Sequence, residues 1–259
     1  MSRSVGKRRV IFAAGVLGFG LSGFFDGILL HQVLQWHHLL SLVPGETFRR
    51  IETQILADGL FHVLMYVITA AGLFLLWRAR HWFGTGEVSW RSVAGGGLLG
   101  FGLWNVVDVG LFHWVLRIHR LRVDVPDPML YDVAWIMILG LLPLLVGWLL
   151  MRGEQPGRGE GGRGAAALLG VLALTAAPIA SLPAPDTSTA VVLFASGSPV
   201  RGFQAALAAE ASVLWMSADG RMMAVQADTP GATFKLYQAG ATLVTRSPAL
   251  AGCAVAVRI

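Results

Sequence analysis

The sequence predicts a mainly α-helical integral membrane protein, in which a duplicated two-helix hairpin forms a four-helix transmembrane bundle. A fifth transmembrane helix and a small C-terminal α+β domain are expected to follow. Of the 259 residues, 55% are hydrophobic and 14% charged, which is too apolar for an ordinary soluble domain. Four apolar runs approach or exceed the roughly 20 residues that cross a bilayer. The first of these runs recurs as the third.

The apolar runs set the expected order of the elements. A basic segment ending at Arg9 precedes the first run. This order also suits a signal peptide, but no small-x-small cleavage site precedes polar sequence, so we expect a retained helix. The expected spans are Val10–Leu30, Ile55–Trp77, Val93–Leu116, Met129–Met151 and Gly164–Leu182. The expected domains are a four-helix membrane domain at 1–152 (repeats about 10–80 and 92–152), a linker at 153–163, a fifth transmembrane helix at 164–185 and an α+β domain at 186–259.

Short runs of strand and helix character alternate beyond residue 186. They predict a strand at 190–195, a helix at 199–210, a hairpin at 212–226 turning at Asp219-Gly220, a helix at 229–239 and a strand at 241–246. The order β-α-β-β-α-β is that of a ferredoxin-like unit.

Basic residues flank the apolar runs and predict the orientation. Ten lie on the side of the N-terminus and five on the other, which favours a cytoplasmic N-terminus and, with five spans, an extracytoplasmic C-terminal domain. The protein would then reside in the cytoplasmic (inner) membrane, in contact with lipid. The net charge of +5 could suggest nucleic-acid binding, but there is no basic face on a soluble domain, so no nucleic-acid partner is expected.

The repeat carries ionisable residues in register. At a shift of 82 positions, 12 of the 23 residues from 17 to 39 are identical. The matched pairs include Asp26 with Asp108, His31 with His113 and His37 with His119. The second and fourth spans align at a shift of 74, where Asp58 meets Asp132. Two helices per copy preserve orientation, so the copies should be related by a pseudo-twofold axis along the membrane normal.

Helix directions predict that these groups share one layer in the outer third of the bilayer. Ionisable side chains at membrane depth are costly and usually have a partner or a task. We therefore expect a metal site with the ligand candidates His31, His62, His113, Asp26, Asp58, Asp108 and Asp132. His62 breaks the symmetry, because its counterpart is Ile136. His37, His38 and His119 are expected at the outer interface, and His81 in a cytoplasmic loop.

One feature leaves the number of sites open. Asp26 and His31 are five residues apart, about 140° around an ideal α-helix. Either the helix is distorted near Gly27 or the groups belong to two sites.

Three motifs resemble a family of predicted bacterial membrane proteins known as domain of unknown function 2243. They are the stretch GFFDGILLHQVLQWHH at 23–38, ADGLFH at 57–62 and DPMLYDVAW at 127–135. The resemblance covers about residues 10–152 and implies a four-helix membrane domain without an established activity.

The residues support four functional hypotheses. The first is binding of a Cu, Zn or Fe ion, with a role in metal handling for a respiratory or other membrane complex. Imidazole and carboxylate suit Cu(II), Zn or Fe, and the single cysteine, Cys253, excludes a thiolate cluster. The second is electron transfer by a b-type haem with His31 and His113 as axial ligands. The others are a proton-coupled transporter and a purely structural membrane subunit. No nucleophilic triad, P-loop or dinucleotide fingerprint is recognisable, which leaves enzyme activity open.

Overall fold

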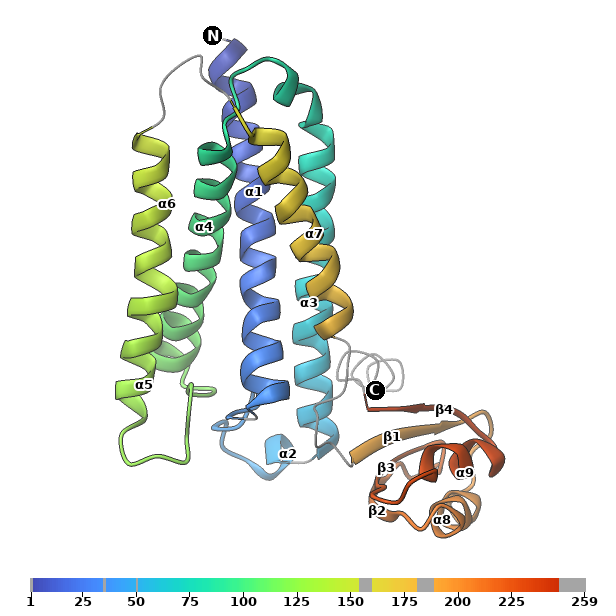
Figure 1. Cartoon of the computed structure of the whole chain (residues 1–259). Helices are drawn as coiled ribbons and strands as arrows, with labels where there is room; N and C mark the ends of the chain where they lie inside the picture. The colour runs from blue at the N-terminus through green and yellow to red at the C-terminus, as the bar shows by residue number, and fades with distance from the viewer. Residues whose placement is uncertain (1, 35, 50, 154–159, 181–188, 247–259) are drawn as a thin grey trace. The chain divides into compact units, whose positions relative to one another are not determined.

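The computed structural model describes residues 2–34, 36–49, 51–153, 160–180 and 189–246 (Figure 1). The chain forms two compact units, Met1–Val43 with His62–Ala180 and Pro44–Phe61 with Ser181–Ile259. Most of the expected linker, the end of the expected fifth span beyond Ala180 and Cys253 lie outside the described residues.

Among the described residues, five helices are long and apolar enough to cross a membrane, as the sequence predicts. These candidate spans are Val5–His31, Leu56–Arg78, Trp90–Val115, Pro128–Arg152 and Gly162–Ala180. The helical elements are α1 (Ser2–Asp26), η1 (Gly27–Val33), α2 (Glu46–Arg49), α3 (Ile51–Arg78), η2 (Arg80–Gly84), α4 (Trp90–Val107), η3 (Asp108–Val115), α5 (Pro128–Trp135), η4 (Ile136–Leu141), α6 (Leu142–Arg152) and α7 (Gly162–Ala180). The segments η1, η3 and η4 are π-helices that continue α1, α4 and α5.

Capping side chains mark the starts of α4 and α5. The side chain of Ser89 accepts hydrogen bonds from the backbone N–H groups of Arg91 and Ser92 at the start of α4. Asp127 caps α5 in the same way, with Pro128 in the first turn. Capping side chains satisfy amide groups that have no partner within the helix, so they fix its first residue.

Glycines allow α1 and α4 to pack with their backbones in close approach. A Cβ atom at Gly18 would overlap the carbonyl oxygen of Gly97, and one at Gly100 would overlap that of Gly15. Contacts of this kind are typical of membrane helices, where small residues let the helices gain dispersion energy. The α1–α4 pair thus forms the centre of the first unit, and α6 packs on α4 through Gly95 and Gly147.

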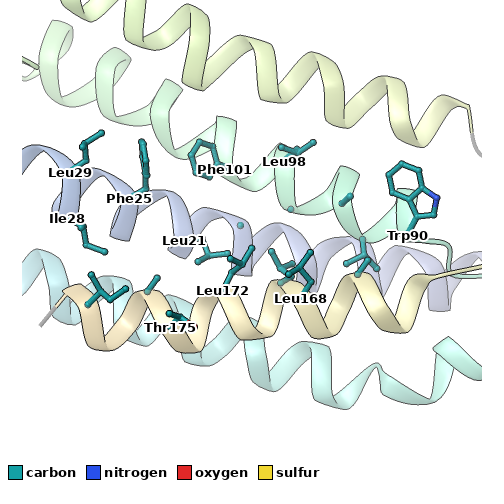
Figure 2. Close-up of a pocket in the computed structure, with 18 residues that line it drawn as sticks. Leu21, Phe25, Ile28, Leu29, Trp90, Leu98, Phe101, Leu168, Leu172 and Thr175 are labelled. Carbon is teal, nitrogen blue, oxygen red and sulfur yellow. The ribbon is translucent and has the colours of Figure 1, made fainter.

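An apolar groove of about 780 Å³ lies between α1, α4 and α7 (Figure 2). Leu21, Phe25, Leu98 and Leu172 are among its lining residues. The hydroxyl of Thr175, one of the few polar groups there, donates to the carbonyl of Val171 in its own helix. Such a surface suits the acyl chains of the bilayer and offers no ligand set for an ion.

The C-terminal part of the second unit contains a small antiparallel sheet. Its elements are β1 (Thr189–Phe194), α8 (Pro199–Ala208), β2 (Ser212–Met216), β3 (Met222–Gln226), α9 (Ala232–Gln238) and β4 (Ala241–Thr245). The strand order is β2-β3-β1-β4, and all neighbours are antiparallel. Val192, Phe194 and Val225 of the sheet pack with Ala205 of α8 and Leu236 of α9 in one apolar core. The expected turn at Asp219-Gly220 joins β2 to β3, where Gly220 has a φ of +67°.

Candidate metal centre

Both helices that carry the repeated Asp–His motif become π-helices beside its acidic residue. The α-helical hydrogen bonding of α1 gives way at Gly27 and that of α4 at Asp108. In a π-helix, backbone hydrogen bonds join residues five apart, and such segments are frequent at functional sites. The bonds from Leu34 N to Leu29 O and from Leu116 N to Leu111 O, both 2.8 Å, have this spacing. The wider turn brings Asp26 and His31 onto one face, which an ideal α-helix would not do.

The first triad consists of Asp26, His31 and His37. Each offers one ligand atom, and the three atoms lie within 4.8 Å of one another. The Nε2 atoms of His31 and His37 are 3.0 Å apart, and Nδ1 of His37 lies 3.0 Å from the carbonyl oxygen of Leu121. All three side chains are buried. Burial, followed by the neighbouring His31 and His119 rings, lowers the pKa of His37 well below its usual range.

The second triad consists of Asp108, His113 and His119 and has the same sequence spacing. Its three ligand atoms also lie within 4.8 Å of one another. The carboxylate of Asp108 reaches both rings, 3.2 Å from Nε2 of His113 and 3.3 Å from Nε2 of His119. These side chains are at most 2% exposed.

Asp132 supports the second triad from α5. Its carboxylate accepts a hydrogen bond from Nδ1 of His113 at 2.8 Å and from the backbone N–H of Leu121 at 3.1 Å. Its Oδ2 atom also accepts hydrogen bonds from Nη1 of Arg120 at 2.6 Å, which balances its charge, and from Nε1 of Trp114 at 3.2 Å. Asp132 therefore orients His113 so that Nε2 faces Asp108. It also fixes Leu121, whose carbonyl oxygen holds His37 of the first triad.

The two triads meet through their later histidines. The rings of His37 and His119 are stacked, with centroids 4.8 Å apart and planes 16° apart. Within each triad the two rings are arranged edge to face with centroids 4.6 Å apart, at 76° for His31–His37 and 73° for His113–His119. The six residues thus form one continuous cluster, which we call the Asp–His cluster.

The remaining candidates from the sequence have different environments. His62 of α3 is fully buried, and its ring centroid lies 6.5 Å from that of His31. Asp58 is buried, belongs to the second compact unit and is a member of neither triad. His38 and His81 are exposed.

His37 and His119, which were expected at the outer interface, follow the candidate spans that end at His31 and Val115, and both are at most 3% exposed, so they are buried among protein side chains. The carbonyl oxygen of Leu121 lies 3.0 Å from Nδ1 of His37, and the ring of His119 stacks on that of His37. Their matching positions in the repeat, six residues after His31 and His113, are the sequence feature that could have indicated that they belong to the triads.

The fold and the cluster define the protein as a helical membrane protein with buried imidazole and carboxylate groups. The family model of predicted membrane proteins designated domain of unknown function 2243 matches residues 13–154, and the chain belongs to that family. The matched region contains the whole Asp–His cluster, and the resemblance seen in the sequence is confirmed. No curated protein and no solved structure matches the chain.

Proposed function

We propose that the protein binds a transition-metal ion within the membrane through the Asp–His cluster. The observation that carries this proposal is the orientation of two histidines by groups outside the triads. Nδ1 of His113 is held by Asp132 and Nδ1 of His37 by the carbonyl oxygen of Leu121, which leaves each Nε2 directed into the cluster. A hydrogen bond from the second ring nitrogen to a carboxylate or a carbonyl is the usual support of a metal-binding histidine.

The spacing of the ligand atoms supports the same proposal. With metal–nitrogen distances of about 2.0 Å, two ligands of a tetrahedral ion are separated by roughly 3.3 Å. The separations between His31 and His37, His113 and Asp108, and His119 and Asp108 are 3.0, 3.2 and 3.3 Å. The ligand atoms would need little movement to coordinate an ion. Two imidazoles and one carboxylate suit Zn, Fe(II) or Cu(II).

The charge of the cluster favours a bound cation. Asp26 and Asp108 are both 2% exposed, and a buried carboxylate without a counter-charge is costly in a low-dielectric medium. Arg120 compensates Asp132, and His113 and His119 lie beside Asp108, so Asp26 is the carboxylate for which a metal ion would be the natural counter-charge.

The haem alternative has weaker support. Both ring nitrogens of His113 are engaged, Nδ1 with Asp132 and Nε2 with Asp108. Nε2 of His31 faces His37. Axial ligation of a haem by His31 and His113 would require both rings to leave these partners.

Reciprocal contacts support the proposed duplication. Gly18 of α1 packs on Gly97 of α4, and their equivalents at a shift of 82, Gly100 and Gly15, pack on each other. The strand order of the C-terminal sheet likewise supports the ferredoxin-like assignment. We also propose an inner-membrane location with a cytoplasmic N-terminus, which reporter fusions at each end would test. A role of the protein in handling metal for respiratory enzymes stays a prediction.

Metal content and absorption of the detergent-purified protein test the proposed function. We expect bound Zn, Fe or Cu and no Soret band. We also expect the double variant His31→Gln with His113→Gln to lose the metal, whereas the matched variant His38→Gln, changed at an exposed histidine, retains it. A Soret band that disappears in the double variant would favour haem instead, and a wild-type protein without metal after reloading would contradict both.

A further inference from the structure

We infer that the Asp–His cluster is a dinuclear centre, in which each Asp–His–His triad holds its own divalent metal ion. This inference rests on the proposed function and adds the number of ions and their arrangement. Nothing in the sequence alone chooses between one shared ion and two.

Each triad is a complete ligand set by itself. It supplies two imidazole nitrogens and one carboxylate oxygen within 4.8 Å of one another. Three protein ligands with a fourth position left for water are typical of exchangeable or reactive metal sites. One ion sharing all six residues would need six donors around a single point. The ligand atoms of the six residues instead fall into two groups of three, which favours two centres.

The first triad contains an unsatisfied group that points to an ion of its own. Asp26 is only 2% exposed, and its Oδ1 atom has no hydrogen-bond partner among the described residues. Buried carboxylate oxygens are normally satisfied. In the second triad, by contrast, each oxygen of Asp108 lies near a histidine nitrogen. An ion confined to the second triad would leave this oxygen of Asp26 without a partner.

The stacked rings of His37 and His119 join the two sites. Their centroids are 4.8 Å apart, so the two proposed sites have ligand rings in direct contact, and two paramagnetic ions held there are expected to interact magnetically. Each triad would give its divalent ion one carboxylate, so a hydroxide at the fourth position would make each site neutral. A bound divalent ion can lower the pKa of water enough to supply that hydroxide near pH 7.

Titration of the full-length, chelator-treated protein in detergent with Co²⁺ tests the stoichiometry. We expect two equivalents in the wild type and in the exposed-site control His38→Gln. One equivalent is expected in each single variant, His31→Gln and His113→Gln, and none in the double variant. Size-exclusion chromatography checks that each variant is folded.

Loading with Cu²⁺ gives a readout that needs no variant. We expect an electron paramagnetic resonance spectrum with a half-field transition from two interacting ions. One equivalent in the wild type, lost in either single variant, would overturn the dinuclear inference and leave metal binding intact. Two equivalents that persist in His31→Gln would overturn it as well, and no binding at all would overturn both proposals.

Discussion

Asp132 is the residue on which both triads converge without being a member of either. It holds His113 directly and His37 through Leu121. This arrangement explains why a carboxylate paired with Arg120 lies beside the cluster: it sets the direction of the ligands, and its charge is already compensated.

We predict that Asp132→Asn weakens metal binding by about 10–100-fold, the usual effect of losing a carboxylate that supports a metal-binding histidine. The amide cannot accept from His113, Leu121 and Arg120 as the carboxylate does. Competition with a chelator of known affinity measures the change. Asp124→Asn is the matched control, because Asp124 forms an exposed ion pair with Arg122. Equal affinity in the two variants would contradict the positioning role.

Asn105 links three helical segments away from the ligand atoms. Its side chain donates to Ser22 of α1 at 2.7 Å and accepts from Trp135 of α5 at 2.7 Å. Because it is 1% exposed, removal leaves both partners without this bond inside the bundle.

We therefore predict that Asn105→Ala destabilises the protein by about 1 kcal/mol, the order found for hydrogen bonds between membrane helices. Thermal unfolding in detergent measures the loss. Thr175→Ala is the control, because its hydroxyl bonds only within α7 among the described residues and is exposed. An unchanged melting temperature in Asn105→Ala would show that Ser22 and Trp135 find other partners.

At the scale of elements, the π-helices η1 and η3 create the triads. A residue in an α-helical frame five positions after Asp108 would point away from it, whereas the π-helical turn aligns His113 with that carboxylate. The five-residue spacing between aspartate and histidine therefore requires a π-helical turn if both side chains are to face one site.

Inserting one alanine after Gly110 should place His113 six positions after Asp108, a spacing that neither an α-helix nor a π-helix aligns, and so turn its ring away from that carboxylate. We expect loss of the ion of the second triad, read as a fall in bound Co²⁺ by one equivalent. Gly110→Ala is the matched control, because a Cβ there would meet nothing within 4 Å. If the insertion retains full binding, the residue spacing within η3 is not what aligns the ligands.

The helices and the site differ in how far the sequence predicts them. The candidate spans follow from apolar length, and the observed spans begin and end within about five residues of the expected ones. The π-helical turn cannot be predicted from the sequence pattern, because arguments from hydrophobic periodicity assume 3.6 residues per turn. The position of His37 cannot be predicted from the sequence either, since its ring contacts the carbonyl oxygen of Leu121, which is 84 residues away in the chain.

At the scale of the whole molecule, the Asp–His cluster and its supporting residues all fall within the first compact unit. The chain that builds the sheet, from Thr189 to Thr245, belongs to the second.

A chain ending at residue 180 should therefore bind the same number of metal ions as the full-length protein. Elemental analysis of the two purified chains, prepared together, makes the comparison. A truncated chain that is folded by size-exclusion chromatography yet free of metal would instead mean that the C-terminal domain contributes to binding.

The close packing of Gly18 on Gly97 and of Gly100 on Gly15 has a consequence for ancestry. Such a face is self-complementary, as the interface of a twofold homodimer must be. If the hairpin arose as a single gene, two copies would have associated through this face with the later histidine of each stacked near the axis. Fusion into one chain would then have freed each half to diverge, which accounts for a histidine at 62 in one half and an isoleucine at 136 in the other.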